Sequence, residues 1–307
     1  MKRLLAALLC LLMLAGSALA EGEFPELNDA GFYDGGEFVY TDAETGVWRY
    51  CSDTLKVEIY RRTSTDPKRI WYEAEVWSTE DNAFAMLPWD EENRMTSQSW
   101  PYKIARKHGT VLAVNSDFAH LRLKQKKRAG ILLRQGKILS SKTLAKNKGN
   151  FPNLDTLALY PDGMMEVYYS NEKTAEEYQE MGASDVLAFG PLLIRDGELN
   201  TAGLKKYGTS NAPRTAVGMV EKGHYFVMML EGRHTGSKGG PVSFLAEKML
   251  EKGCQLAFNL DGGQSSTIVF MGEQICTIGG TTGKNASARR TAEILGIGTS
   301  GLVPGND

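Results

Sequence analysis

The run Asn259-Leu260-Asp261-Gly262-Gly263-Gln264-Ser265-Ser266-Thr267 decides how this 307-residue chain can be interpreted. Apolar segments lie on both sides of it, at 255–258 and 268–270, and this pattern predicts a strand that leads into a tight turn. Its two glycines let a backbone approach a ligand closely. With a carboxylate and two hydroxyls nearby, such a turn suits an oxyanion or a sugar phosphate. A glycine-rich hairpin, whose Asp and Ser side chains cap their own backbone, is the equal alternative.

Strand–turn–strand signals extend through most of the chain outside this run. At four places a residue pair that ends in glycine separates two apolar runs, and each such pattern predicts a β-hairpin. Further strands are predicted at 56–60, 70–77, 111–114 and 294–297, and a loop at 81–98. The four turns are Gln135-Gly136, Asp162-Gly163, Asp196-Gly197 and Lys222-Gly223.

Three helices are predicted between the strands, at 100–108, 174–181 and 241–251. In the last of them, apolar residues recur at helical spacing and form one stripe. Together these elements predict an α+β fold of largely antiparallel or mixed β-sheets with a few packed helices, in a single compact domain. Within it we expect a strand-rich N-terminal extension at 21–100 that packs on a core at 101–307.

The first 20 residues have the features of a secretory signal peptide. Lys2 and Arg3 precede an apolar stretch at 4–14, and Ala18-Leu19-Ala20 provides a cleavage site. That apolar stretch is too short to span a bilayer, so we expect no stable membrane insertion. The expected location is therefore secreted or in the cell envelope.

Charge and histidine spacing argue against several kinds of partner. The formal net charge of −2 at pH 7 is not that of a nucleic-acid-binding protein, which would be strongly basic. The four histidines have no zinc-binding spacing, and we expect no metal and no cofactor. His234, in a glycine-rich loop, suits either a proton carrier or a solvated loop residue. The cysteines left after cleavage, Cys51, Cys254 and Cys276, are odd in number and allow at most one internal disulfide.

Other polar side chains stand at the ends of predicted strands. Arg214 follows a proline at the mouth of a strand, where its planar donors suit a phosphate, a carboxylate or a local acid. Asn115 and Asp117 end a buried strand and suit either a functional role or simple capping. Arg289 and Glu293 precede the closing strand, and this pattern favours a structural ion pair between them.

Four sequence blocks, in this order, resemble the phosphodiester glycosidase family. The resemblance covers roughly residues 105–300, and the ending at 289–297 is similar to the closing strand of the family. It departs at Ser116, where the family usually has glycine, and at Gln264, where a third glycine is frequent. The four blocks are AVNSDF (113–118), AFGPLLIRDGEL (188–199), APRTAVGM (212–219) and NLDGGQSST (259–267).

The resemblance implies an exported hydrolase that acts on a sugar linked through its anomeric carbon to phosphate. Ordinary glycosidases use two carboxylates, one of which protonates the leaving oxygen. A phosphate leaving group, with a second pKa of about 6, needs charge neutralisation more than a proton. One carboxylate then suffices, and Asp261 is the expected nucleophile or base, with Asp117 and Glu293 in reserve.

The other candidate residues are expected to bind a carbohydrate phosphodiester. Guanidinium, backbone N–H and hydroxyl groups would neutralise its phosphate. Asn115 would hold a sugar hydroxyl or an N-acetyl group, and Arg289 would be a second phosphate contact or an orienting contact. The remaining expected substrate-binding residues are Arg214, Thr215, Gly262, Gly263, Ser265 and Ser266.

Two other functions fit the same residues. A non-catalytic cell-envelope module would bind sugar phosphates through Arg214 and the glycines, but would tolerate the loss of Asp261. A phosphodiesterase would instead break the P–O bond, with a divalent metal held by Asp117 and Asp261. The glycosidase chemistry would also serve the trimming of an exopolysaccharide. Chelator sensitivity and the site of oxygen-18 incorporation separate these reactions.

Overall fold

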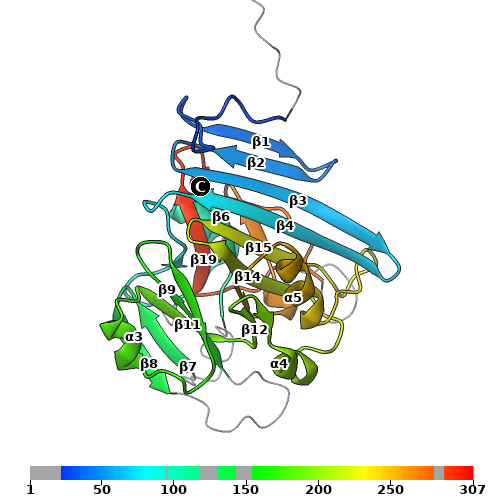
Figure 1. The fold of residues 1–307 in the computed structure, drawn as a ribbon. Coiled ribbons are helices and arrows are strands. Elements are labelled where there is room, and N and C mark those ends of the chain that lie inside the picture. Colours follow the sequence, from blue (N-terminus) through cyan, green and yellow to red (C-terminus); the bar gives the residue numbers. More distant parts are fainter. Residues whose placement is uncertain (1–21, 95, 118–129, 143–153, 280–286, 307) are drawn as a thin grey trace, which may run out of the picture.

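The computed structural model describes residues 22–94, 96–117, 130–142, 154–279 and 287–306, and within these ranges three β-sheets surround the main hydrophobic core (Figure 1). Each strand pair in the described ranges is antiparallel. The predicted signal peptide at 1–20 lies outside the described residues.

The largest sheet joins the N-terminal strands to the middle of the chain. In order across this sheet, the strands are β1 (Phe38–Asp42), β2 (Val47–Cys51), β3 (Leu55–Thr65), β4 (Lys68–Ser78), β15 (His224–Leu230), β14 (Arg214–Glu221), β16 (Leu256–Asn259), β12 (Leu192–Arg195) and β13 (Glu198–Leu199). β15 pairs along its whole length with residues 71–77 of β4, so the N-terminal segment shares this sheet with the rest of the chain. The domain boundary near residue 100 remains a prediction.

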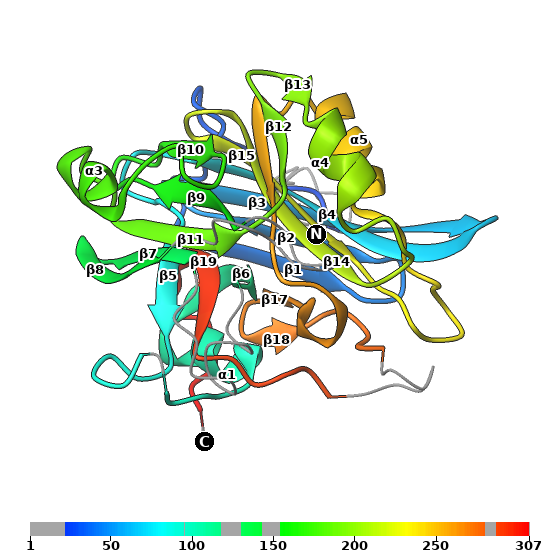
Figure 2. The ribbon, with the colours of Figure 1, turned by 90° about the horizontal axis from the view of Figure 1, so that it is seen from below.

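Two smaller sheets pack against the largest one. The second consists, in order, of β10 (Met165–Tyr168), β9 (Asp155–Leu159), β11 (Asp185–Phe189), β7 (Gly130–Arg134) and β8 (Lys137–Lys142). The third consists of β18 (Glu273–Gln274), β17 (Ile268–Phe270), β6 (Thr110–Asn115), β19 (Glu293–Thr299) and β5 (Ala85–Pro88). Figure 2, seen from below, shows the second and third sheets lying beside each other under the long strands of the first.

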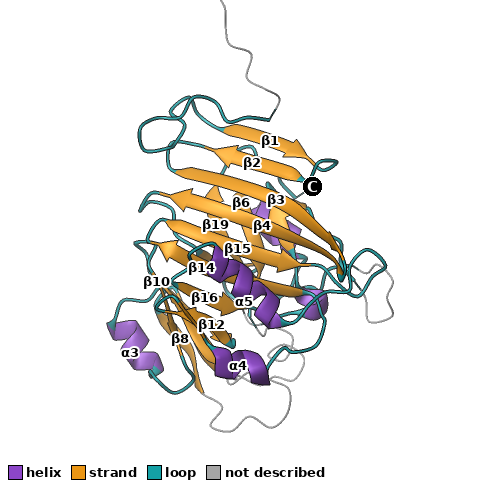
Figure 3. Cartoon of the chain, turned by 45° about the vertical axis from the view of Figure 1, so that its right-hand side comes forward, coloured by secondary structure: helices purple, strands orange, loops and turns teal. Residues whose placement is uncertain are grey.

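Short helices cover the sheet faces that turn away from the main core (Figure 3). α5 (Val242–Glu251) and α4 (Thr201–Lys206) lie on the largest sheet, α3 (Ala175–Glu180) on the second and α1 (Pro101–Lys107) on the third. α3 starts with a capping box, in which Thr174 and Glu177 satisfy each other's backbone N–H groups. α1 has its proline at the first position, where no helical hydrogen bond is lost.

The structure confirms the predicted α+β class and the mostly antiparallel sheets. The four predicted hairpins form β7–β8, β9–β10, β12–β13 and β14–β15. The loop predicted at 81–98 is wrong over Ala85–Pro88, which forms β5 and pairs with β19. Its sequence, Ala-Met-Leu-Pro, is apolar throughout and does not alternate, so only its pairing with β19 identifies it as a strand. α4, β1 and β2 were not predicted.

Cys51, Cys254 and Cys276 are buried, and each is free. No helix in the described residues is both long and apolar enough to span a membrane.

Candidate active site

The run at 259–267 crosses from the largest sheet to the third sheet. It leaves β16 beside β14, where Asn259 is opposite Ala216. It enters β17 beside β6, where Ile268 is opposite Val114. On the other side of β6, Asn115 is opposite Ile294, just after Glu293. The ends of three segments that are far apart in sequence therefore meet around this crossing.

Asn115 holds the crossing in place. Its side chain is buried, and its Nδ2 donates a hydrogen bond of 2.8 Å to the backbone oxygen of Asp261. Its Oδ1 accepts bonds from Thr215 Oγ1 at 2.7 Å and from the Thr267 N–H at 3.1 Å. Asn115 and Thr215 were expected to bind substrate, but here their polar groups fasten the backbone that carries Asp261. A buried side-chain amide needs such hydrogen-bond partners, so few donor or acceptor positions of Asn115 remain for a ligand.

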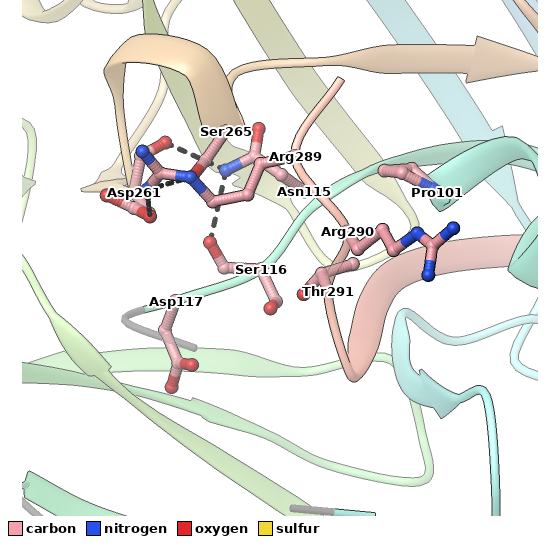
Figure 4. Close-up of a pocket in the computed structure, with 9 residues that line it drawn as sticks. All are labelled: Pro101, Asn115, Ser116, Asp117, Asp261, Ser265, Arg289, Arg290 and Thr291. Carbon is pink, nitrogen blue, oxygen red and sulfur yellow. Dashed lines mark hydrogen bonds and ion pairs between the residues drawn. The ribbon is translucent and has the colours of Figure 1, made fainter. Parts of the chain in front are cut away.

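The Asp261 carboxylate lies between Arg289 and its own turn (Figure 4). Its side chain is 14 % exposed, and Arg289 Nη1 is 4.0 Å from its Oδ2. Its Oδ1 accepts a hydrogen bond of 2.9 Å from the Gly262 N–H. Arg289 also donates to Ser265 Oγ at 3.2 Å. Burial raises the pKa of Asp261 to about 6, although Ser265 and Arg289 oppose that rise.

Two cavities meet at Asp261 and Arg289, which line both of them. The smaller one, drawn in Figure 4, also contains Asn115, Ser116 and Asp117. The larger one has a volume of about 460 Å³, which is in the range of small-molecule sites. Four cations and one carboxylate line it among the described residues: Lys206, Arg214, Arg233, Arg289 and Asp261. This balance of charge suits an anionic ligand.

Arg214 enters the larger cavity from the start of β14. Its Nη2 donates to the backbone oxygens of Ser210 at 3.0 Å and Gly208 at 3.2 Å, and its Nε donates to Gly240 O at 3.3 Å. Burial, together with the nearby charge of Arg233, lowers the pKa of Arg214 to about 10, so the group stays charged at neutral pH. Asp261 and Arg214, which were predicted to act together, line the same cavity.

The two glycines of the run act differently from the expectation. The Gly262 N–H donates to Asp261, and the Gly263 N–H donates to Pro213 O at 2.9 Å, so both are already used. Instead, the glycines permit close approaches. A Cβ on Gly262 would lie 3.0 Å from the backbone oxygen of Pro213, and a Cβ on Gly263 would lie 3.0 Å from Arg233 Nη1. Gly263 also has a φ of 68°, which other residues rarely adopt.

The two serines of the run point to different places. Ser265 lines the smaller cavity and contacts Arg289. Ser266 is buried, and its Oγ has no hydrogen-bond partner in the described part of the chain. Of this pair, Ser265 is the one placed to reach a ligand beside Asp261.

The two reserve acids are held by a buried arginine that sequence reasoning missed. Arg134 Nε is 2.8 Å from Glu293 Oε2, and its Nη2 is 3.7 Å from Asp117 Oδ2. Glu293 also lies 3.4 Å from Arg94 Nη1. The ion pair expected between Arg289 and Glu293 is therefore wrong, because Arg289 turns to Asp261 and Ser265 instead. Glu293 lines neither cavity, whereas Asp117 lines the smaller one.

His234 is not a solvated loop residue. Its side chain is 6 % exposed, and its Nε2 is 3.0 Å from the buried Oε2 of Glu231. No group of three or more His, Cys, Asp or Glu side chains in the described residues is arranged to hold a metal ion. The sequence patterns also did not single out Arg233 and Lys206 as cavity residues. The available signal was Gly232, directly before Arg233, since a glycine there indicates a turn with close backbone contacts.

Comparisons with known proteins identify the family and the fold of the chain. A family model described as phosphodiester glycosidase matches residues 108–298. The fold is similar to the catalytic domain of zebrafish N-acetylglucosamine-1-phosphodiester alpha-N-acetylglucosaminidase, whose structure is auto-inhibited by its pro-peptide. The TM-score is 0.63 and the sequence identity is 16 %, and the match covers 85 % of this chain and 88 % of that one. It is also similar to a hypothetical protein from Synechocystis, with a TM-score of 0.53 and 13 % identity over 80 % of this chain and 62 % of that one.

A curated relative is the SPbeta prophage-derived uncharacterized protein YomE of Bacillus subtilis (strain 168). It is 31 % identical over 130 residues, which are 42 % of this chain and 20 % of that protein. The match thus spans about a fifth of the length of this relative. The two structural similarities establish the fold, while the family model covers more than half of the chain and includes the crossing, Asp261, Arg214 and Arg289. The chain belongs to the phosphodiester glycosidase family.

Proposed function

We propose that this protein is an exported hydrolase that cleaves the glycosyl C–O bond of a sugar-1-phosphodiester. Family membership supports a glycosidase that acts on phosphodiester-linked sugars. The observation that carries the proposal is the larger cavity, in which the Asp261 carboxylate and the Arg214 guanidinium face the same space. The signal-peptide pattern at 1–20 supports a secreted or cell-envelope location, and a cell-surface glycan or exopolysaccharide is the proposed substrate.

The charges in the larger cavity match this reaction. Asp261 is the one carboxylate among the described residues that line it. A second acid, which ordinary glycosidases use to protonate the leaving oxygen, is not required when the leaving group is a phosphate whose charge is neutralised. Arg214 supplies that neutralisation, and Asp261 acts as the nucleophile or as the base for water. Arg289 contacts Asp261 from the side and orients it.

A turnover screen of the purified protein, lacking residues 1–20, tests the proposal. The expected result is hydrolysis of one or more sugar-1-phosphodiesters that continues in the presence of a chelator. Loss of turnover with the chelator would favour the metal-dependent phosphodiesterase instead. Binding of sugar phosphates without any turnover would favour the non-catalytic envelope module.

Arg214→Ala should chiefly weaken recognition of the phosphate. Loss of a charged hydrogen bond to a phosphoryl oxygen is worth about 1.5–3 kcal/mol, so kcat/KM on a sugar-1-phosphodiester should fall by about 10- to 100-fold. On an aryl glycoside, which has no phosphate, the loss should be much smaller. Arg214→Lys is the matched variant, because it keeps the charge but lacks the planar guanidinium that donates to the three backbone oxygens. Equal losses on both substrates would show that Arg214 supports the loops and not the phosphate.

The pH dependence of the rate follows from the raised pKa of Asp261. A nucleophile or base must be ionised, so kcat/KM should rise with pH through about 6 and level off above it. A fall through the same pH would mean that Asp261 acts as a proton donor. The folded pKa is above the unfolded one, so the protonated group favours folding at low pH, and that contribution is lost as pH rises through about 6. Kinetics and thermal unfolding over pH 4–8 measure both effects.

A further inference from the structure

Arg233 is presented to the larger cavity by a closely packed turn. Its φ of 61° lies in the left-handed region, which is uncommon for a residue other than glycine. A Cβ on its neighbour Gly232 would lie 2.8 Å from Gly239 Cα, so only glycine fits there. His234 and Ser237 close the turn with two reciprocal backbone hydrogen bonds of 3.2 Å. Such strain persists only where the surroundings enforce it, and it is often found at functional sites.

A buried acid lies under this turn. Glu231 is 1 % exposed, and its Oε1 accepts bonds from Tyr72 Oη at 3.0 Å and from the Thr277 N–H at 2.7 Å. Its Oε2 is 3.0 Å from His234 Nε2, a close contact that is not aligned as a hydrogen bond. Ser237 Oγ donates to Glu231 O at 2.8 Å. Glu231 and His234 thus fix the backbone on both sides of Arg233.

The Arg233 guanidinium lines the same cavity as that of Arg214, and its charge lowers the pKa of Arg214. It passes over Gly263, whose hydrogen leaves the space that its Nη1 uses. In the described part of the chain it makes no ion pair or hydrogen bond, although it lines a cavity that also contains Asp261. Two like charges in one cavity repel each other, and a bound anion would remove that repulsion. Arg233 is exposed, but its fixed turn and the glycine at position 263 hold it at the mouth of this cavity.

We propose that Arg233 is a second phosphate-binding residue, which holds the non-bridging phosphoryl oxygens together with Arg214, and that Glu231 and His234 are positioning residues for its turn. The proposal rests on the proposed function in so far as the phosphate of the substrate enters this cavity. The Arg233 guanidinium can donate two parallel hydrogen bonds to phosphoryl oxygens, and Arg214 can add those of its Nη1, because its Nε and Nη2 already donate to backbone oxygens. Their joint presence makes the site selective for a phosphodiester over a neutral glycoside.

Binding of inorganic phosphate, measured by titration calorimetry, tests the role of Arg233 without any turnover. Arg233→Ala should raise the Kd for phosphate by about 10- to 100-fold, as expected for a charged hydrogen bond. Arg233→Lys should recover part of that loss, because it restores the charge but not the fork. Arg62→Ala is the matched control, since Arg62 contacts Glu73 and lines neither cavity, and it should leave the Kd unchanged. An unchanged Kd in Arg233→Ala would overturn the proposal.

A double-mutant cycle tests the positioning role of Glu231. Glu231→Gln should weaken phosphate binding in the wild-type background and have little further effect in Arg233→Ala, because it acts through Arg233. The same factor in both backgrounds would exclude the positioning role. His234→Gln, measured in the same way, provides a second variant if Glu231→Gln does not fold.

Failure of this inference can be distinguished from failure of the proposed function. If phosphate binds through Arg214 and Arg233 but no sugar-1-phosphodiester is cleaved, the anion site stands and the hydrolase does not. If the protein hydrolyses such substrates while Arg233→Ala keeps the KM of the wild type, the hydrolase stands and the role of Arg233 is wrong.

Discussion

Asp261→Asn should lower kcat on a sugar-1-phosphodiester by about 10²- to 10⁴-fold, the usual contribution of a positioned acid–base group. Asparagine has nearly the same shape but cannot ionise, so it loses both the nucleophile and the base. Steady-state kinetics on the best substrate from the turnover screen measures the change. The raised pKa shows that the ionised carboxylate is unfavourable in its site, so the variant should be at least as stable as the wild type at pH 8.

A matched variant separates chemistry from general damage. Asp196 is 93 % exposed in the turn between β12 and β13, where asparagine tolerates the same backbone. Asp196→Asn should therefore keep the rate of the wild type. If Asp261→Asn also kept that rate, Asp261 would have no part in the mechanism.

Arg134→Met should have the largest effect on stability, a loss of about 3–5 kcal/mol in the free energy of unfolding at pH 7. Arg134 is fully buried, and its Nε and Nη1 make bonds to Glu293 and to the backbone oxygens of Leu133 and Val186. Removing its charge leaves Glu293 and Asp117 buried without this compensation. Chemical denaturation, with a constant slope against denaturant, measures the change.

The control for this variant is an arginine at the surface. Arg195 pairs with Glu172 at 2.8 Å, and both side chains are about one third exposed. Arg195→Met should cost less than about 1 kcal/mol. Adding Glu293→Gln to Arg134→Met should recover part of the loss, because one of the two buried carboxylates that face Arg134 then carries no charge. A cost below about 1 kcal/mol for Arg134→Met would show that Arg134 does not compensate these acids.

Local sequence chemistry was sufficient to predict the hairpins. Gln135 and Asp196 have φ values of 49° and 54°, and the glycines that follow them have 72° and 73°, so these pairs form turns that few other residues adopt. β5 could not be predicted in this way, because its four residues become a strand only through pairing with β19. The strand order β14–β16–β12 likewise depends on pairings between distant segments.

The candidate site, too, could be predicted from the sequence only in part. The sequence predicted which residues gather around the 259–267 run, and Asp261, Arg214 and Arg289 do line one cavity. It could not predict which polar groups there remain free to bind a ligand. The polar atoms of Asn115 and the N–H group of Gly263 are bonded to partners that only the folded chain brings near. Arg134 and Arg233 were missed because their positions depend on contacts between distant segments and not on a local pattern.

The position of the broken bond tests the proposed reaction most directly. Hydrolysis of a sugar-1-phosphodiester in water enriched in oxygen-18, followed by mass spectrometry of the phosphate product, reports it. Attack at the anomeric carbon leaves that phosphate unlabelled in the wild type, and almost no product forms in Asp261→Asn. One atom of oxygen-18 in the phosphate would mean that the P–O bond breaks, and would contradict a glycosidase built around Asp261.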